Sequence, residues 1–177
     1  MPVKIEFDIN PPLENLKYWI EHVEKNVIND LSDFWDGWAR KLVAEEIARI
    51  FATQGYGTWA ALSPRYAMRK SKIYPGRTML RAKDVYFRAS IRKGAKGNIF
   101  ESSATEMTWG ADEAWFESTY GFPYPVALEK GSSKMPARSI YDLAAHSEAL
   151  QANLVKGLTD YLHKRIDTES KRTFGNV

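Results

Sequence analysis

Aromatic and basic side chains between positions 56 and 77 have the residue types best suited to binding chemistry. They are Tyr56, Trp59, Arg65, Tyr66, Arg69, Lys70, Lys72, Tyr74 and Arg77. Aromatic rings stack on nucleic-acid bases and basic groups neutralise phosphates, so this mixture could bind single-stranded nucleic acid. The same residue types are enriched at protein interfaces, where they anchor one subunit on the next. From the residue types alone, both interpretations are open.

Basic charge is concentrated in the centre of the chain. The 177 residues carry a formal net charge of +3, yet residues 65–96 contain eleven basic residues against the single acid Asp84. Such a block attracts nucleic acid or an acidic protein surface over a long range, and added salt weakens the attraction. The charge distribution therefore suits both kinds of partner.

The remaining reactive side chains lack the spacing that catalysis or metal binding requires. The histidines His22, His146 and His163 fall in separate predicted helices, and the chain has no cysteine. Zinc sites need paired ligands at short spacing. No serine lies in a nucleophile elbow and no glycine cluster forms a phosphate-binding loop. We therefore expect no enzymatic activity, no cofactor and no metal site.

Composition also indicates where the protein is made. A chain without cysteine is compatible with a reducing compartment such as the bacterial cytoplasm. The first twelve residues lack the pattern of a signal peptide, and no segment approaches the roughly 20 apolar residues of a membrane span. We expect assembly in the cytoplasm of a bacterial host and no membrane partner.

Two periodic stretches predict helices near the N-terminus. The Asn-Pro-Pro sequence at 10–12 suits a helix start, and apolar residues then recur at three- and four-residue spacing through 13–27. A second, aromatic-rich run covers 31–51. Polar residues at 29–30 separate the runs, which favours two helices over one broken helix.

The centre of the chain predicts a loop, a short helix and strands. Glycines and prolines punctuate residues 53–76, so we expect a long, ordered binding loop there. Residues 77–92 suit a short helix that runs into a strand. Residues 99–101 and 106–109 predict a β-hairpin. Aromatic residues between 115 and 128 predict a third strand or extended segment.

A leucine-rich ridge predicts a helix near the C-terminus. Ser139 with Asp142 marks its start, and apolar residues recur at four-residue steps from Leu150 to Ile166. We favour burial of this ridge within the subunit over a groove for a partner.

The order of these elements predicts an α+β fold with N-terminal helices, a small antiparallel sheet and a long C-terminal helix. We expect a single domain over residues 1–177. Within it, 1–52 form a helical N-terminal extension, 53–143 an α+β core, and 144–177 a C-terminal helix and tail.

Several short motifs follow one another between residues 50 and 143. They are Phe51, Gly57, Trp59 and Leu62, then Arg69-Lys70, Pro75-Gly76, Met79-Leu80 and Ser90-Ile91, and after these Met107-Thr108-Trp109-Gly110, Pro123-Tyr124-Pro125-Val126-Ala127 and Met135-Pro136-Ala137-Arg138. In this order they resemble the phage virion morphogenesis family, the tail-completion and head-tail joining proteins of Mu-like phages. The order of several weak motifs is more specific than any one of them.

The chain departs from the family's pattern at two places. Ala82-Lys83-Asp84-Val85 stands where the family commonly carries a Thr-Gly-Arg-Leu-like stretch. Leu128-Glu129-Lys130 replaces a polar His-Gln pair that often precedes the glycine. These changes indicate that surface chemistry at the interface has diverged.

The resemblance implies a structural bacteriophage or prophage protein that completes the tail or joins head and tail. It implies a homo-oligomeric ring, hexameric by family resemblance, at the head-proximal end of the tail in the virion, in contact with tail-tube and head-connector proteins. The predicted subunit interface consists of Trp59, Tyr66, Arg69, Lys70, Met135, Pro136 and Arg138. The alternative is a nucleic-acid-binding module in which the basic aromatic loop 56–77 contacts DNA.

Overall fold

A computed structural model describes residues 13–81, 83–133 and 135–175, and the predicted helix start at 10–12 lies outside them. The elements in chain order are α1 (Leu13–Val23), the π-helical turn η1 (Glu24–Ile28), α2 (Ser32–Phe34), the π-helical turn η2 (Trp35–Ala39), α3 (Arg40–Thr53), α4 (Pro64–Ile73), α5 (Val85–Ile91), β1 (Asn98–Ser102), β2 (Met107–Ala111), α6 (Glu113–Tyr120), α7 (Tyr124–Lys130), α8 (Tyr141–Ala145) and α9 (Glu148–Phe174). The predicted α+β class is confirmed: N-terminal helices, a small antiparallel sheet and a long C-terminal helix.

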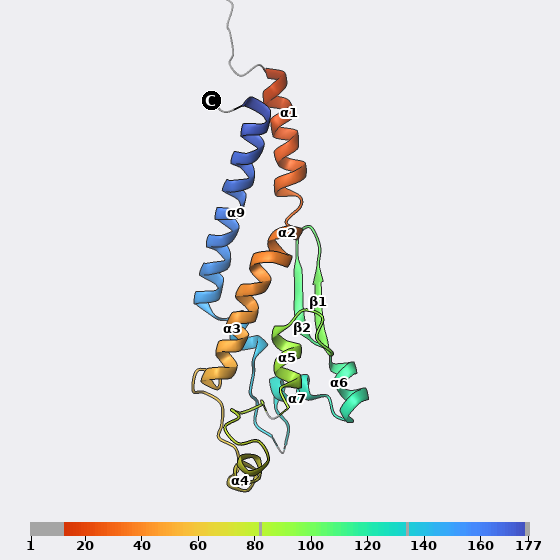
Figure 1. The fold of residues 1–177 in the computed structure, drawn as a ribbon, viewed down its shortest axis with the longest axis vertical. Coiled ribbons are helices and arrows are strands. Elements are labelled where there is room, and N and C mark those ends of the chain that lie inside the picture. The colour runs from red at the N-terminus through yellow and green to blue at the C-terminus, as the bar shows by residue number, and fades with distance from the viewer. Residues whose placement is uncertain (1–12, 82, 134, 176–177) are drawn as a thin grey trace, which may run out of the picture.

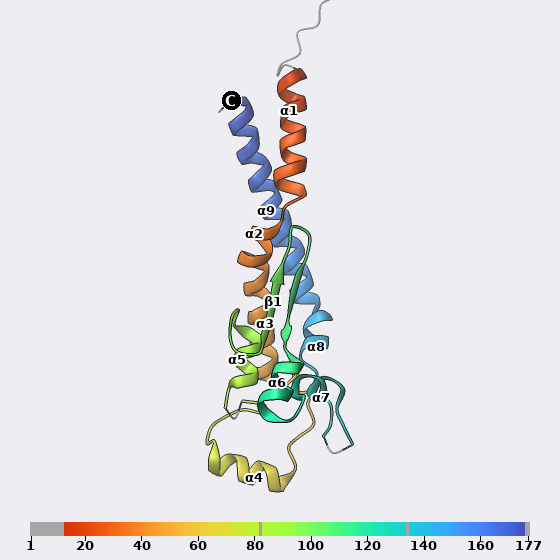
Figure 2. The same cartoon turned by 90° about the vertical axis from the view of Figure 1, so that its right-hand side faces the viewer.

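The molecule is elongated, with α4 at one end and an arm of two helices at the other (Figures 1 and 2). The arm consists of α1 and the C-terminal half of α9. The indole Nε1 of Trp19 donates to Ser170 Oγ at 3.0 Å, and its ring lies 6.3 Å from that of Phe174. Near the base of the arm, the Arg165 guanidinium donates to the carbonyl oxygen of Asn26 at 2.8 Å. These contacts hold α1 and η1 against α9.

The C-terminal helix begins later than predicted. Residues near Ser139 and Asp142 start the separate short helix α8, and α9 starts at Glu148. The side chain of Ser147 caps α9 by accepting a hydrogen bond from the backbone N–H of Leu150 at 3.2 Å. Leu150 is buried in the core, so the leucine ridge packs within the subunit at this end, as predicted.

The predicted β-hairpin is confirmed and lies against α5. Phe100 pairs with Trp109 across the strands, and their rings meet edge to face at 5.5 Å. The indole Nε1 of Trp109 donates to the carbonyl oxygen of Ser90 on α5 at 2.7 Å. At the other end, the backbone N–H of Leu31 donates to the carbonyl oxygen of Ala104 in the hairpin turn. The hairpin is thereby fixed to helices at both ends.

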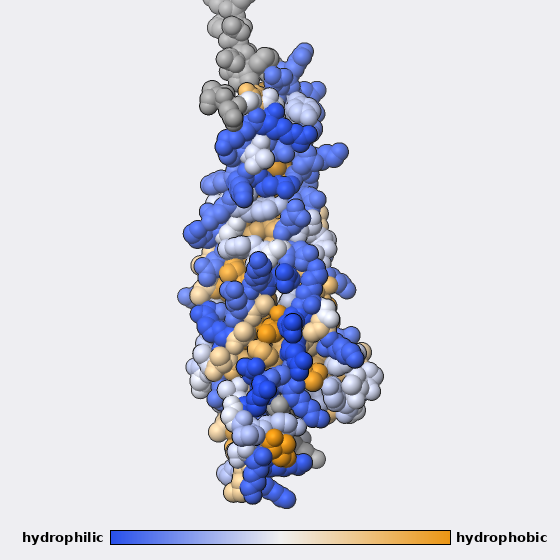
Figure 3. All heavy atoms as spheres, viewed as in Figure 1, coloured by the Kyte–Doolittle hydropathy of each residue, from blue (hydrophilic) through white to orange (hydrophobic). Residues whose placement is uncertain are grey.

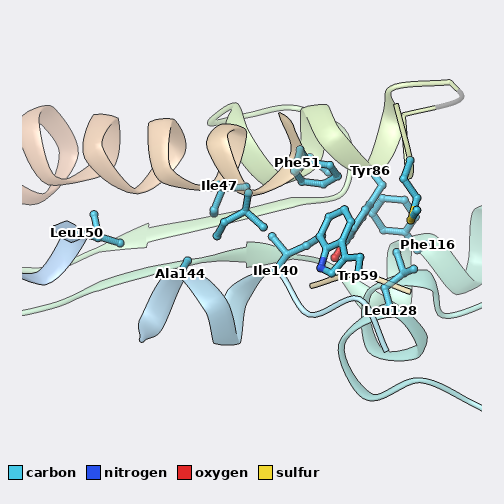
Figure 4. Close-up of a cluster of buried hydrophobic side chains, with 12 residues drawn as sticks. Ile47, Phe51, Trp59, Tyr86, Phe116, Leu128, Ile140, Ala144 and Leu150 are labelled. Atoms are coloured by element: carbon cyan, nitrogen blue, oxygen red, sulfur yellow. The ribbon is translucent and has the colours of Figure 1, made fainter. Parts of the chain in front are cut away.

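The core lies where α3, α5 and the segments from α6 to α9 meet (Figure 4). Phe51 is its centre: its ring makes edge-to-face contacts with Trp59 at 6.1 Å and with Tyr86 at 5.9 Å. Burial of these aromatic rings supplies much of the apolar area that stabilises the fold. The buried cluster comprises Ile47, Ile50, Phe51, Trp59, Met79, Tyr86, Ala89, Phe116, Leu128, Ile140, Ala144 and Leu150.

The predicted third strand or extended segment is wrong, because α6 covers residues 113–120 and α7 covers 124–130. The Asp112 carboxylate accepts a hydrogen bond from the backbone N–H of Trp115 at 3.0 Å and so caps α6. Phe116 and Tyr120 lie four residues apart on α6, and their rings are 6.0 Å apart. This distance fits one turn of a helix, because residues four apart on a strand lie about 13 Å apart.

The long loop predicted for residues 53–76 is also wrong in part, because it contains α4. Pro64 occupies the first turn of this helix, where a missing backbone N–H costs nothing. The helix predicted within 77–92 is shorter than expected. Leu80 and Asp84 have φ angles of 63° and 56°, and this left-handed backbone delays the start of α5 until Val85.

Candidate assembly surface

Trp59 was predicted at the subunit interface, but the structure places it in the core. Its side chain is 8% exposed. The indole Nε1 donates to the carbonyl oxygen of Ser139 at 3.1 Å. Gly55 has a φ angle of 68° and lies so close that a Cβ atom there would be 2.3 Å from the indole ring. Trp59 is therefore used within the subunit, which corrects the expectation that it contacts a neighbour.

Lys70 is likewise turned inward, with 7% of the residue exposed. Its ammonium group donates to the carbonyl oxygen of Arg77 at 2.8 Å and also to that of Thr78. Burial lowers the pKa of this amine, since the charged form loses hydration. Lys70 ties α4 to the turn that follows it, and its charge is not available to a partner.

Arg138 is the third predicted interface residue that proves to be internal, at 4% exposed. Its guanidinium donates to the carbonyl oxygen of Ala60 at 3.1 Å, and its backbone N–H donates to that of Leu128 at 2.7 Å. Burial lowers the pKa of Arg138, and the nearby Tyr66 acts in the opposite direction. Arg138 and Trp59 together join the segments 59–60 and 138–139.

The other four predicted interface residues keep exposed atoms. Tyr66 and Arg69 are exposed on α4, and Pro136 is exposed in the segment before α8. Met135 is half-buried, since it packs against the core. The surface open to a partner is thus narrower than predicted, and it is concentrated on α4.

The exposed side of α4 combines large apolar side chains with positive charge. We refer to Arg65, Tyr66, Met68, Arg69, Lys72 and Ile73 as the α4 surface. Met68 is 63% exposed, Ile73 53% and Tyr66 51%. Its three cationic side chains make no ion pair with any residue that the structure describes. Figure 3 shows hydrophobic and hydrophilic surface side by side at this end of the molecule.

Three other residues of the basic block form ion pairs within the subunit. Arg77 and Arg81 both bind the Asp84 carboxylate, at 2.5 and 3.0 Å, and fix the turn before α5. Lys93 pairs with Asp36 at 2.7 Å. The block that is continuous in the sequence is therefore divided in space.

Two grooves of opposite charge flank α6. One, of about 520 Å³, is basic and is lined by Arg88, Arg92, Lys93 and Lys96 with Trp115 and Tyr120 from α6. The other, of about 680 Å³, lies on the side of Glu113 and Glu117 and is called the acidic groove below. Its lining residues are Ile99, Trp109, Gly110, Ala111, Asp112, Glu113, Ala114, Glu117, Pro125, Val126, Glu129, Lys130 and Tyr141. The subunit thus presents opposite charge on two sides of one helix.

The acidic groove has an apolar floor and free carboxylates on its rim. Glu113 and Glu117 are exposed and unpaired among the described residues. Glu129, in contrast, is committed to the fold: it accepts hydrogen bonds from Ser139 Oγ at 2.6 Å and from the backbone N–H groups of Ile140 and Tyr141 at 2.7 and 3.1 Å.

No family model, curated protein or solved structure matches the chain. Within the described residues, no three histidine or acidic side chains gather as metal ligands, and no helix is long and apolar enough to cross a membrane.

Sequence reasoning missed the acidic groove. The carboxylates of this groove, Glu113 and Glu117, are four residues apart, so they lie about 6 Å apart along a helix but about 13 Å apart along a strand. The signal was present in the capping residue Asp112 and in Gly121, whose φ angle of 68° ends α6. Interpreting the segment as extended placed these two acids too far apart to form one charged surface.

Proposed function

We propose that this chain is a structural subunit of a bacteriophage or prophage particle that assembles into a ring and completes the tail or joins it to the head. The resemblance of its ordered motifs to the phage virion morphogenesis family gives the class of particle. The opposite charges on the two sides of α6 support assembly of identical subunits. A ring requires each copy to present two different, complementary surfaces to its neighbours.

The observation that carries the proposal is that the motifs meet in space. Trp59 and the Met135-Pro136-Ala137-Arg138 segment lie far apart in the sequence, yet Trp59 binds Ser139 and Arg138 binds Ala60. These contacts fix the base from which α4 projects. Residues of the motifs that resemble the family thus hold α4, whose exposed side is suited to assembly.

The test is electron microscopy of particles made with this gene deleted and then restored. The proposal predicts full heads beside unjoined tails, or tails of abnormal length, and recovery of joined virions on complementation. Unjoined tails of normal length would indicate joining, whereas over-long tails would indicate completion. Normal virions from the deletion strain would refute a structural role.

The basic groove favours a second candidate function, binding of nucleic acid. Arg88, Arg92 and Lys96 provide phosphate partners, and Trp115 and Tyr120 provide rings for stacking. In this second proposal the nucleic acid would contact residues beside α6, whereas the sequence prediction had used the segment 56–77. It predicts DNA binding that weakens steeply as salt is raised and that Arg88→Glu with Arg92→Glu abolishes. The absence of any DNA binding at low salt would eliminate it.

A further inference from the structure

We infer that the α4 surface of one subunit docks into the acidic groove of the next copy, which makes the contact between neighbours in the assembly heterologous. This inference rests on the proposed function and names the surfaces through which the subunits meet. It commits to a second copy of this chain as the occupant of the groove.

Charge is the first reason for this pairing. Arg65, Arg69 and Lys72 are exposed cations without partners among the described residues, and the groove rim presents the free carboxylates of Glu113 and Glu117. Opposite potentials steer association and set the register of an interface. The chain therefore carries both halves of a complementary pair.

Shape and polarity are the second reason. Helix α4 projects at the end of the molecule (Figures 1 and 2), whereas its proposed partner is a shallow, open groove. The groove has a volume of about 680 Å³ and is open to solvent along its length, so side chains of a neighbouring helix can reach it. Tyr66 and Met68 provide apolar groups for a floor that includes Trp109 and Val126.

The geometry of the subunit excludes an internal pairing. α4 forms the extreme end of the molecule, and α6 and α7, which line the acidic groove, lie nearer the hairpin (Figure 1). The α4 surface is exposed, so it does not fill the groove of its own chain. Because the two surfaces differ, each copy can bind one neighbour through α4 and another through the groove, as ring closure requires.

The experiment uses the absence of cysteine from the chain. Met68→Cys places one thiol on the α4 surface, and Ala114→Cys places another on the groove. Treating a mixture of the two full-length variants with a short bis-maleimide should give a cross-linked dimer, whereas each variant alone should give none. A chain carrying both changes should give a ladder of oligomers.

Val155→Cys provides the matched control, because Val155 on α9 is 66% exposed and so as accessible as Met68. Mixed with the Ala114→Cys variant, it should give no dimer. Equal cross-linking of this control, no dimer from the Met68 and Ala114 mixture, or dimers of the Met68→Cys variant alone would overturn the inferred contact. Native mass spectrometry of the wild type distinguishes failure of the inferred contact from failure of the proposed function. If the wild type forms rings but the cross-link is absent, the inferred contact is refuted and ring assembly is not.

Charge reversal tests the same contact without thiols. Arg65→Glu with Arg69→Glu, or Glu113→Lys with Glu117→Lys, should each weaken self-association by about tenfold or more, and a chain with all four changes should recover it. Reversal of two exposed lysines elsewhere, Lys41→Glu with Lys164→Glu, should have no such effect. Unchanged self-association together with loss of DNA binding in the arginine variant would overturn the inference and assign α4 to nucleic acid.

Discussion

Replacement of Trp59 by alanine distinguishes a core residue from an interface residue. The change removes a buried indole that packs edge to face on Phe51 and donates to the carbonyl oxygen of Ser139. Truncation of a buried tryptophan costs about 3–5 kcal/mol of unfolding free energy. Whole domains are stable by about 5–15 kcal/mol, so the loss is a large share of the total. We expect the Trp59→Ala variant to be markedly less stable.

Urea denaturation followed by far-ultraviolet circular dichroism measures this loss. With a slope of about 2 kcal/mol per molar urea, the midpoint should fall by about 1.5–2.5 M. Trp59→Phe keeps an aromatic ring but removes the donor, so it should cost only about 1–3 kcal/mol. Tyr66→Ala is the matched control, because Tyr66 is an exposed aromatic residue. Its free energy of unfolding should change by less than about 0.5 kcal/mol.

The two residues should also differ in assembly. Tyr66→Ala should weaken self-association while leaving the monomer stable. A Trp59→Ala variant with an unchanged urea midpoint and lost self-association would refute the assignment of Trp59 to the core.

Three further predictions concern the fold. Burial raises the pKa of Glu46, but hydrogen bonds outweigh it and hold the pKa below its ordinary value of 4.5. The ionised carboxylate therefore stabilises the fold above about pH 4.5, and this stabilisation is lost as the pH falls through the lowered pKa. In a plot of melting temperature against pH, Glu46→Gln should therefore show a smaller fall at acid pH than the wild type. A Cβ at Gly157 would clash with Trp38. In the wild type, Gly157→Ala should cost about 1–3 kcal/mol by overpacking, offset in part by the gain of about 1 kcal/mol in helix propensity. In a Trp38→Ala background the clash is absent, so a double-mutant cycle should show Gly157→Ala to be stabilising by about 1 kcal/mol. Glu129→Ala removes three hydrogen bonds from residues 139–141 and should cost at least about 1.5–3 kcal/mol by thermal denaturation, whereas an unchanged midpoint would contradict its structural role.

Local patterns predicted the elements whose periodicity is unambiguous. The N-terminal helices repeat at three- and four-residue spacing, and the hairpin at 98–111 has short strands joined by a polar turn. The C-terminal helix followed from its leucine ridge, although its start was placed too early. Each of these elements is specified by residues close together in the sequence.

The candidate site depended on tertiary contacts that no local pattern contains. Trp59, Lys70 and Arg138 have the residue types of an interface, but each bonds a backbone carbonyl of its own chain. Whether a tryptophan or an arginine serves the core or a partner depends on which segment packs over it. The grooves beside α6 depended in addition on recognising residues 113–120 as helix.

Location of the chain in purified particles tests the central claim most directly. A peptide tag after Val177 would lie beyond α9, at the end of the molecule away from α4 (Figure 1). Gold labelling of the tag, viewed by electron microscopy, should place it at the head-proximal end of the tail in each labelled virion. Purified, infectious virions that lack the chain altogether would contradict the account.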